Sequence, residues 1–83
     1  MAHVWRHREG ALLATTMTGR YGSRFHLNVE MIPNEDWDWI VWRAGDSYDV
    51  RYGVARSAEA AMMAAEAAAA RLAETEAILA DAY

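Results

Sequence analysis

Three consecutive runs of residues between positions 24 and 54 alternate between apolar and polar side chains. Because side chains alternate between the two faces of a β-strand, each run predicts a strand with one apolar face. We predict strands over residues 24–32, 37–43 and 47–54. Their apolar positions are Phe25, Leu27, Val29 and Met31, then Trp37, Trp39 and Val41, and then Tyr48, Val50, Tyr52 and Val54.

Short turn-forming segments separate these runs. Pro33 and Asn34 stand between the first and the second run, and Gly45 stands between the second and the third. Such short connections favour antiparallel neighbours and therefore a meander. The threonine-rich stretch at residues 11–18 favours a further strand. The sequence leaves open whether residues 1–18 form this strand or are disordered, and we expect residues 1–10 to fray.

An alanine-rich segment without glycine or proline predicts a helix over residues 57–80. Ser57 is placed to cap the first turn, and Glu59 is placed where the helix dipole favours negative charge. The mostly small apolar residues of this segment fall within one arc of the helical projection, which would let the helix approach a sheet closely. These residues are Ala58, Ala61, Met62, Ala65, Ala69, Leu72 and Leu79.

Together the elements predict one α+β domain over residues 1–83. It consists of an antiparallel meander of three to four strands with one long C-terminal helix packed on one face. The core would contain Phe25, Leu27, Val29, Met31, Trp37, Trp39, Val41, Tyr48, Val50 and Tyr52. The opposite, open face would carry Arg24, His26, Asn28, Glu30, Asp38, Ile40, Trp42, Asp49 and Arg51. An antiparallel sheet tolerates one face in water.

The run over residues 37–43 breaks its own alternation, because Ile40 and Trp42 fall on the side predicted to be polar. An exposed apolar patch that includes a tryptophan is typical of a protein interface. The other explanation is cross-strand packing, in which Trp42 covers Arg51 and His26 and only stabilises the sheet. The sequence keeps both explanations open.

Charge adds a second candidate feature. The net charge is −4, and several carboxylates crowd the predicted loops and the strands that they join. A spaced acidic rim could imitate nucleic-acid phosphates and occupy a basic groove of another protein, although most charge runs only keep a surface solvated. These carboxylates are Glu35, Asp36, Asp38, Asp46 and Asp49.

Other classes of function find little support in the sequence. There is no cysteine, and His3 and His7 lack the further ligands that a metal site requires, so we expect neither metal nor cofactor. No catalytic motif is present, and we expect no enzyme. The acidic balance makes direct nucleic-acid binding unlikely; Arg24, Arg43 and Arg51 beside the aromatic residues are its only basis. No apolar run is long enough to cross a bilayer, and the absence of cysteine favours a reducing compartment, so we expect a cytoplasmic protein.

The segment Asp36-Trp-Asp-Trp-Ile-Val-Trp, followed by Tyr52-Gly-Val-Ala-Arg-Ser-Ala-Glu-Ala-Ala-Met and an alanine-rich helix, resembles small phage- or prophage-encoded proteins, among them anti-CRISPR proteins. This resemblance covers roughly residues 24–75 and implies inhibition of a nucleic-acid-guided effector by protein–protein contact, without transferable site residues. The same segment is similar to HicB-type antitoxin domains, which Gly53, Ser57 and Glu59-Ala60 match loosely. Double-stranded-RNA-binding modules share the order of strands and helix, but here the first helix and the lysines are missing.

These observations predict a non-enzymatic protein-binding module, a phage-encoded inhibitor of the anti-CRISPR kind, that docks on a basic surface of a nucleic-acid-handling complex. The candidate contact residues are Asp36, Asp38, Ile40, Trp42, Asp46, Asp49 and Arg51. The alternative is an antitoxin-like or structural protein that associates through its alanine-rich helix, for example as a homodimer paired through Leu72 and Leu79.

Overall fold

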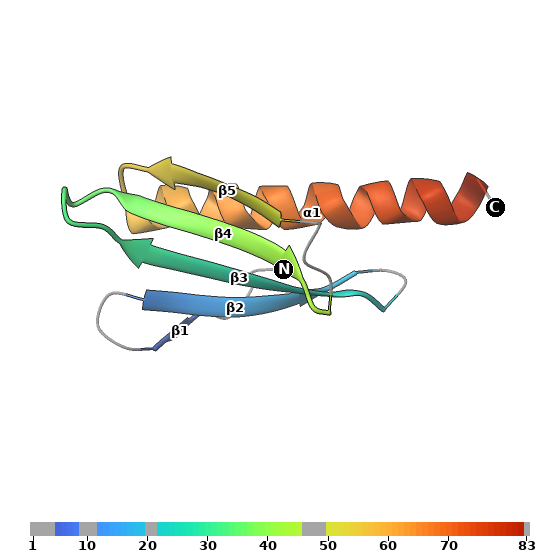
Figure 1. The fold of residues 1–83 in the computed structure, drawn as a ribbon, viewed down its shortest axis with the longest axis horizontal. Coiled ribbons are helices and arrows are strands. Elements are labelled where there is room, and N and C mark those ends of the chain that lie inside the picture. The colour runs from blue at the N-terminus through green and yellow to red at the C-terminus, as the bar shows by residue number, and fades with distance from the viewer. Residues whose placement is uncertain (1–4, 9–11, 20–21, 46–49, 83) are drawn as a thin grey trace.

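In the computed structural model, one antiparallel sheet carries one long helix. The structure describes residues 5–8, 12–19, 22–45 and 50–82, with side chains described up to residue 75. The strands are β1 (Arg6–His7), β2 (Leu12–Thr18), β3 (Arg24–Met31), β4 (Trp37–Arg43) and β5 (Val50–Ala55), and the helix is α1 (Ala58–Ala82). The five strands lie in the order of the sequence, each antiparallel to the next (Figure 1). The predicted α+β meander with a C-terminal helix is therefore confirmed.

The described part of the chain contains one strand more than the prediction allowed. Residues 1–10 were expected to fray, but Arg6 and His7 pair with Ala14 and Leu13 of β2. Two residues are too few for a period of two to be recognised in the sequence. The predicted strand over residues 11–18 is present as β2, for which the sequence had left disorder open.

The β3–β4 hairpin turns where proline and asparagine predicted it. The Asp36 backbone N–H donates to the Asn34 side-chain oxygen at 3.0 Å, a side-chain-to-backbone bond that is typical of asparagine in turns. Glu35 adopts a φ of 70° between them. The Ile32 N–H donates to the Asp36 carbonyl at 2.8 Å and closes the loop.

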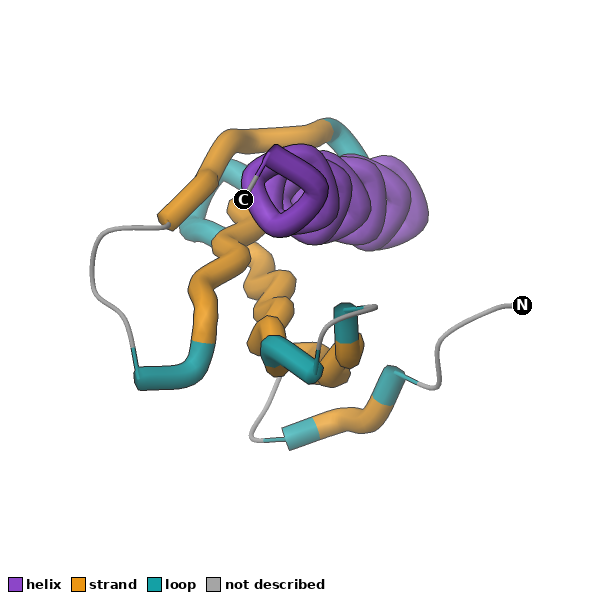
Figure 2. Tube along the Cα trace, turned by 90° about the vertical axis from the view of Figure 1, so that its right-hand side faces the viewer, coloured by secondary structure: helices purple, strands orange, loops and turns teal. Residues whose placement is uncertain are grey.

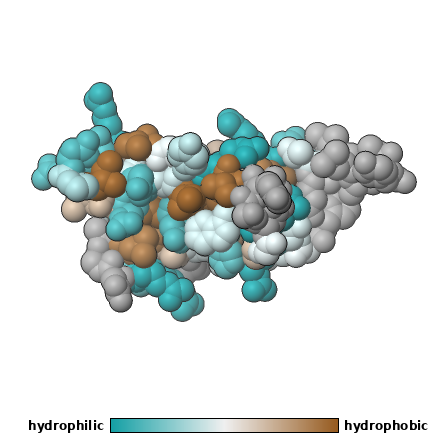
Figure 3. All heavy atoms as spheres, viewed as in Figure 1, coloured by the Kyte–Doolittle hydropathy of each residue, from teal (hydrophilic) through white to brown (hydrophobic). Residues whose placement is uncertain are grey.

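The helix begins where the capping residue predicted it. The Ala60 backbone N–H donates to Ser57 Oγ at 3.1 Å, which satisfies one of the free amides of the first turn. From there α1 runs back along the sheet, and Figure 1 shows its last turns beyond the ends of the strands. In Figure 2, α1 lies on one side of the strands and β5 curves over it. The sheet therefore has a helix-covered face and an open face, and the open face is turned to the viewer in Figure 3.

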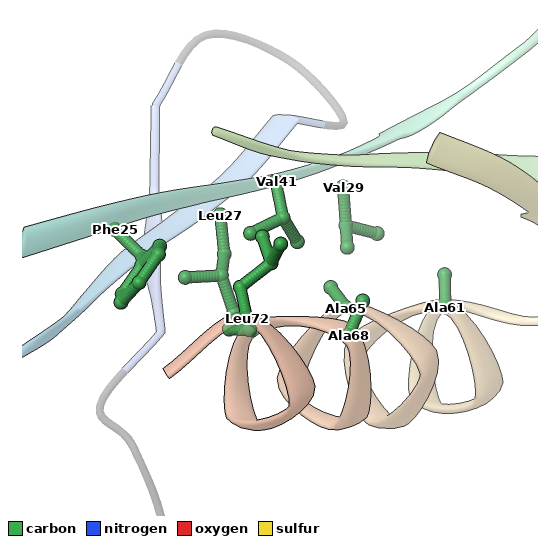
Figure 4. Packing of buried hydrophobic residues seen from close by; sticks show 9 residues of the cluster. Phe25, Leu27, Val29, Val41, Ala61, Ala65, Ala68 and Leu72 are labelled. Carbon is green, nitrogen blue, oxygen red and sulfur yellow. The ribbon is translucent and has the colours of Figure 1, made fainter. Parts of the chain in front are cut away.

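The core lies between β3, β4 and the alanine side of α1. Phe25, Leu27, Val29 and Val41 are completely buried, and in Figure 4 they point toward the helix. All but one of the opposing helix positions are alanines, which lets the backbones approach closely (Figure 4). They are Ala61, Ala65, Ala68, Ala69 and Leu72. The apolar arc predicted for the helix is thus confirmed for Ala61, Ala65, Ala69 and Leu72.

Candidate functional site

The main difference from the sequence prediction is the direction in which β5 faces. Val50, Tyr52 and Val54 were predicted on one face, and the first two were predicted in the core. The register pairs Trp42 with Val50, Ile40 with Tyr52, and Asp38 with Val54. Paired residues of an antiparallel ladder project to the same face, so all three lie on the open face. The alternation within the strand is as predicted, but the assignment of its apolar side to the core is wrong.

Trp39 and Gly53 give a physical reason for this orientation. Gly53 pairs with Trp39 on the helix-covered face. A Cβ at Gly53 would lie 2.8 Å from three atoms of the Trp39 indole. The indole therefore occupies the space above this position, which only glycine leaves free. A shift by one residue would put Tyr52 or Val54 beneath the indole instead.

Because β5 turns Tyr52 and Val54 to the open face, the apolar surface there is larger than Ile40 alone would make it. Ile40 is 37% exposed, Tyr52 78% and Val54 61%. Ile40 and Tyr52 are direct neighbours, and Val54 follows Tyr52 on the same side of β5. We call these three residues the apolar strip. Hydrophobic residues stand among hydrophilic ones on this side of the molecule in Figure 3.

Carboxylates border the apolar strip at the β3–β4 hairpin. Glu30 pairs with Asp38, and Asp38 in turn pairs with Val54 of the strip. Glu35 and Asp36 lie in the adjoining turn, where the Asn34 side-chain amide donates to Asp36 Oδ2 at 3.1 Å. We call Glu30, Glu35, Asp36 and Asp38 the acidic hairpin end. It contains two of the predicted contact residues, Asp36 and Asp38.

Beyond the strip, toward β1, the open face is hollowed. The hollow has a volume of about 580 Å³. None of the described residues that line it is acidic. We call it the arginine groove, because two arginines line it: Arg6 of β1 and Arg8, which follows β1. Its lining includes Arg6, Arg8, Ala14, Thr16, His26 and Trp42.

Trp42 forms one side of this groove and is stacked on His26. The two ring centroids are 5.2 Å apart, with 24° between the ring planes. His26 and Trp42 are direct neighbours across β3 and β4. The cross-strand packing expected for Trp42 is therefore present toward His26. The expected packing on Arg51 is wrong, because Arg51 pairs with Val41 and belongs to the helix-covered face.

The other predicted contact residues do not join this surface. Arg51 donates from its guanidinium to the neighbouring Val50 carbonyl at 2.9 Å. Asp46 and Asp49, like the predicted core residue Tyr48, lie outside the described residues. Of the seven candidates, Asp38, Ile40 and Trp42 share the open face, and Asp36 adjoins it.

Two further predictions concerned arginines and the helix. Arg43, named with Arg24 and Arg51 for nucleic-acid contacts, places its Cζ 5.5 Å from the Phe25 ring centroid on the helix-covered side.

Leu72, expected to pair with a second helix, is only 6% exposed and belongs to the core. The side chain of Leu79 lies outside the described residues.

On the open face, sequence reasoning missed Val50, Tyr52 and Val54 of β5 and the two groove arginines, Arg6 and Arg8. The prediction for Tyr52 and Val54 used only the alternation within β5, and it assumed that the apolar side of the strand faces the helix. The irregular Ile40 and Trp42 of β4 were the available signal, because an apolar side on one strand favours an apolar side on its neighbour. Arg6 and Arg8 carried only their spacing of two, which fits one face of a strand.

The comparisons with known proteins add no relative. No family model, curated protein or solved structure matches the chain. Among the described residues, no three His, Asp or Glu side chains are placed to hold a metal ion. The described helical residues also lack a stretch that is long and apolar enough to span a membrane.

Proposed function

We propose that this protein is a non-enzymatic binding module that docks on a basic protein surface through the apolar strip and the acidic hairpin end. The observation that carries this proposal is the exposure of Ile40, Tyr52 and Val54 side by side on the open face. Exposed apolar residues with a tyrosine among them are typical of the centre of an interface. A binding role, rather than catalysis, agrees with the apolar character of this surface.

The acidic hairpin end indicates the chemistry of the partner. Glu30 and Asp38 face each other directly across β3 and β4. Like charges at such positions destabilise a sheet. Features that oppose folding are expected at functional sites, and two adjoining carboxylates would attract arginine and lysine on a partner. We therefore propose a partner with a basic rim around an apolar patch.

Basic surfaces of this kind are typical of proteins that handle nucleic acid. The narrower proposal is that the module is a phage-encoded inhibitor, similar to anti-CRISPR proteins, that occupies such a surface. It rests on the resemblance of residues 24–75 and on the net charge of −4.

Substitutions on the strip test the docking surface. The double variant Ile40→Thr/Tyr52→Thr removes apolar area and keeps residues that favour strands. With a partner captured from a bacterial lysate by the unmodified protein, we expect the variant to bind at least tenfold more weakly in a titration. Met63→Gln is the matched control, because Met63 is 71% exposed on α1. Full affinity of a folded Ile40→Thr/Tyr52→Thr protein would contradict the proposal.

A variant that lacks the facing pair of carboxylates in the hairpin tests whether the partner is basic. Glu30→Gln/Asp38→Asn removes the like-charge pair, so folding stability should stay equal or rise. The affinity for the partner should fall and should depend less on salt. Glu59→Gln/Glu74→Gln makes the same change of charge at exposed helix positions. Equal losses in both double variants would show that only net charge matters.

A further inference from the structure

We propose that the arginine groove binds a nucleoside phosphate, either as a free nucleotide or as part of a single-stranded nucleic acid. This inference goes beyond the proposed protein docking and does not depend on it, because the groove and the apolar strip are separate parts of the open face. The observation that carries it is an arginine-bearing wall opposite a stacked His26–Trp42 pair.

The arginine wall is held in place by the backbone of β1. Arg6 pairs with Ala14 of β2, and the Arg8 N–H donates to the Leu12 carbonyl at 2.8 Å. Both arginine side chains are exposed and line the same hollow. None of the described lining residues is a carboxylate, so none of them would compete with a bound phosphate for the arginines. Guanidinium groups bind phosphate oxygens through paired hydrogen bonds.

The floor of the groove includes two residues with short side chains, Ala14 and Thr16. Arg6, Ala14 and Asn28 lie on one rung across β1, β2 and β3, and Thr16 and His26 lie two rungs away, on the same face. The short Ala14 and Thr16 side chains leave the floor low between the arginines and the aromatic pair. A polar ligand would find the hydroxyl of Thr16 and the amide of Asn28 along this floor.

The wall opposite the arginines favours a planar group over a simple anion. Trp42 is half-buried and lines the groove, with His26 stacked on it. Nucleobases stack favourably on aromatic side chains, and every base can do so because each has a planar face. The volume of about 580 Å³ falls within the range of roughly 300–1,000 Å³ that is typical of small-molecule sites. An acidic peptide would satisfy the arginines but would leave this aromatic wall unused.

Nuclear magnetic resonance titration of the intact 83-residue chain tests the proposal. The probes are adenosine monophosphate, ribose 5-phosphate, a short oligothymidylate and poly-glutamate, each at low salt. We expect the nucleotide and the oligothymidylate to shift the backbone signals of Arg6, Arg8 and Thr16 and the indole N–H of Trp42. Ribose 5-phosphate should bind at least tenfold more weakly, because it lacks the base. Tighter binding of the oligothymidylate than of the nucleotide would identify a single strand as the ligand.

Matched arginine variants separate a local site from a general charge effect. Arg6→Gln/Arg8→Gln should weaken binding of the nucleotide at least tenfold. Arg56→Gln/Arg71→Gln makes the same change of charge at exposed positions away from the groove and should leave the affinity unchanged. If two phosphates are contacted in a single strand, the affinity should fall about sevenfold between 50 and 200 mM salt. Tyr52→Thr, on the apolar strip, should not alter nucleotide binding.

Three results would overturn the proposal. The first is the absence of shifts in the groove with nucleotide and oligothymidylate up to millimolar concentration. The second is an equal loss of affinity in both arginine double variants. The third is binding of poly-glutamate that equals or exceeds binding of the oligothymidylate, which would assign the groove to an acidic protein segment. None of these outcomes bears on docking through the apolar strip.

Discussion

Gly53 shows how one residue determines which way a strand faces. The Trp39 indole leaves room for a hydrogen atom at Gly53 but not for a Cβ. Glycine normally weakens a strand, because it loses much conformational freedom and offers no side chain to pack. At this position the absence of a side chain allows a large aromatic group to cover the backbone, and this contact places Tyr52 and Val54 in water.

We therefore predict that Gly53→Ala destabilises the fold, although alanine favours the strand more than glycine does. The added methyl group would overlap the indole, and overpacking of this kind costs about 1–3 kcal/mol. Urea unfolding gives the change in free energy. Val54→Ala is the control on the neighbouring, exposed position and should cost little. A Gly53→Ala protein as stable as the unmodified one would mean that Trp39 does not lie over Gly53.

At the scale of elements, a side-chain hydrogen bond joins the start of the chain to the helix. The Trp5 indole Nε1–H donates to Glu66 Oε1 at 2.8 Å, across 61 residues of sequence. Trp5 directly precedes β1, which has only two residues and one neighbouring strand. So short an edge strand gains little from its own ladder. The bond to α1 therefore contributes to holding Arg6 at the arginine groove.

A double-mutant cycle measures this connection. We predict that Trp5→Phe and Glu66→Ala are coupled by about 0.5–1.5 kcal/mol in the free energy of unfolding, the usual net value of a hydrogen bond. Trp5→Phe and Glu74→Ala should show no coupling, because Glu74 is exposed elsewhere on α1. Additive effects in the first pair would exclude the Trp5–Glu66 bond as a link between β1 and the helix.

At the scale of the whole molecule, the apolar side of α1 is packed against the sheet. Leu72 is buried with the alanines against β3 and β4 (Figure 4). A helix that has buried this leucine in its own core cannot also present it to a second copy. The open face, rather than this part of α1, is then the larger apolar surface that remains for a partner among the described residues.

Leu72→Ala distinguishes a leucine that belongs to the core from a leucine that contacts a second helix. We predict a loss of about 2–5 kcal/mol in the free energy of unfolding, as for other buried leucines. Met63→Ala, on the exposed side of α1, should cost less than about 0.5 kcal/mol. The sedimentation coefficient of the folded Leu72→Ala protein should equal that of the unmodified protein. A Leu72→Ala variant that keeps its stability but changes its oligomeric state would return the residue to a helix–helix interface.

The sequence by itself determined β3, β4, β5 and the helix, because the causes of these elements are local. Alternation predicted the strands, Pro33 and Asn34 predicted a turn, and Ser57 with the alanines predicted the start and the inner side of the helix. These signals act between residues that are neighbours along the chain. They were also sufficient for the meander, since short connections leave antiparallel neighbours as the simplest arrangement.

Only the tertiary structure decided which side of β5 faces water and which residues lie together on the open face. Alternation defines two sides of a strand but does not say which of them meets the helix. Here the contact of Trp39 with Gly53 determines the orientation of β5. As a result, Tyr52 and Val54 lie beside Ile40 on the open face, and Arg51 lies on the helix-covered face instead. The arginine groove depends in the same way on the pairing of Arg6 with Ala14 and of His26 with Trp42. These pairs join residues separated by 8 and 16 positions, and strand register is the physical cause that brings them together.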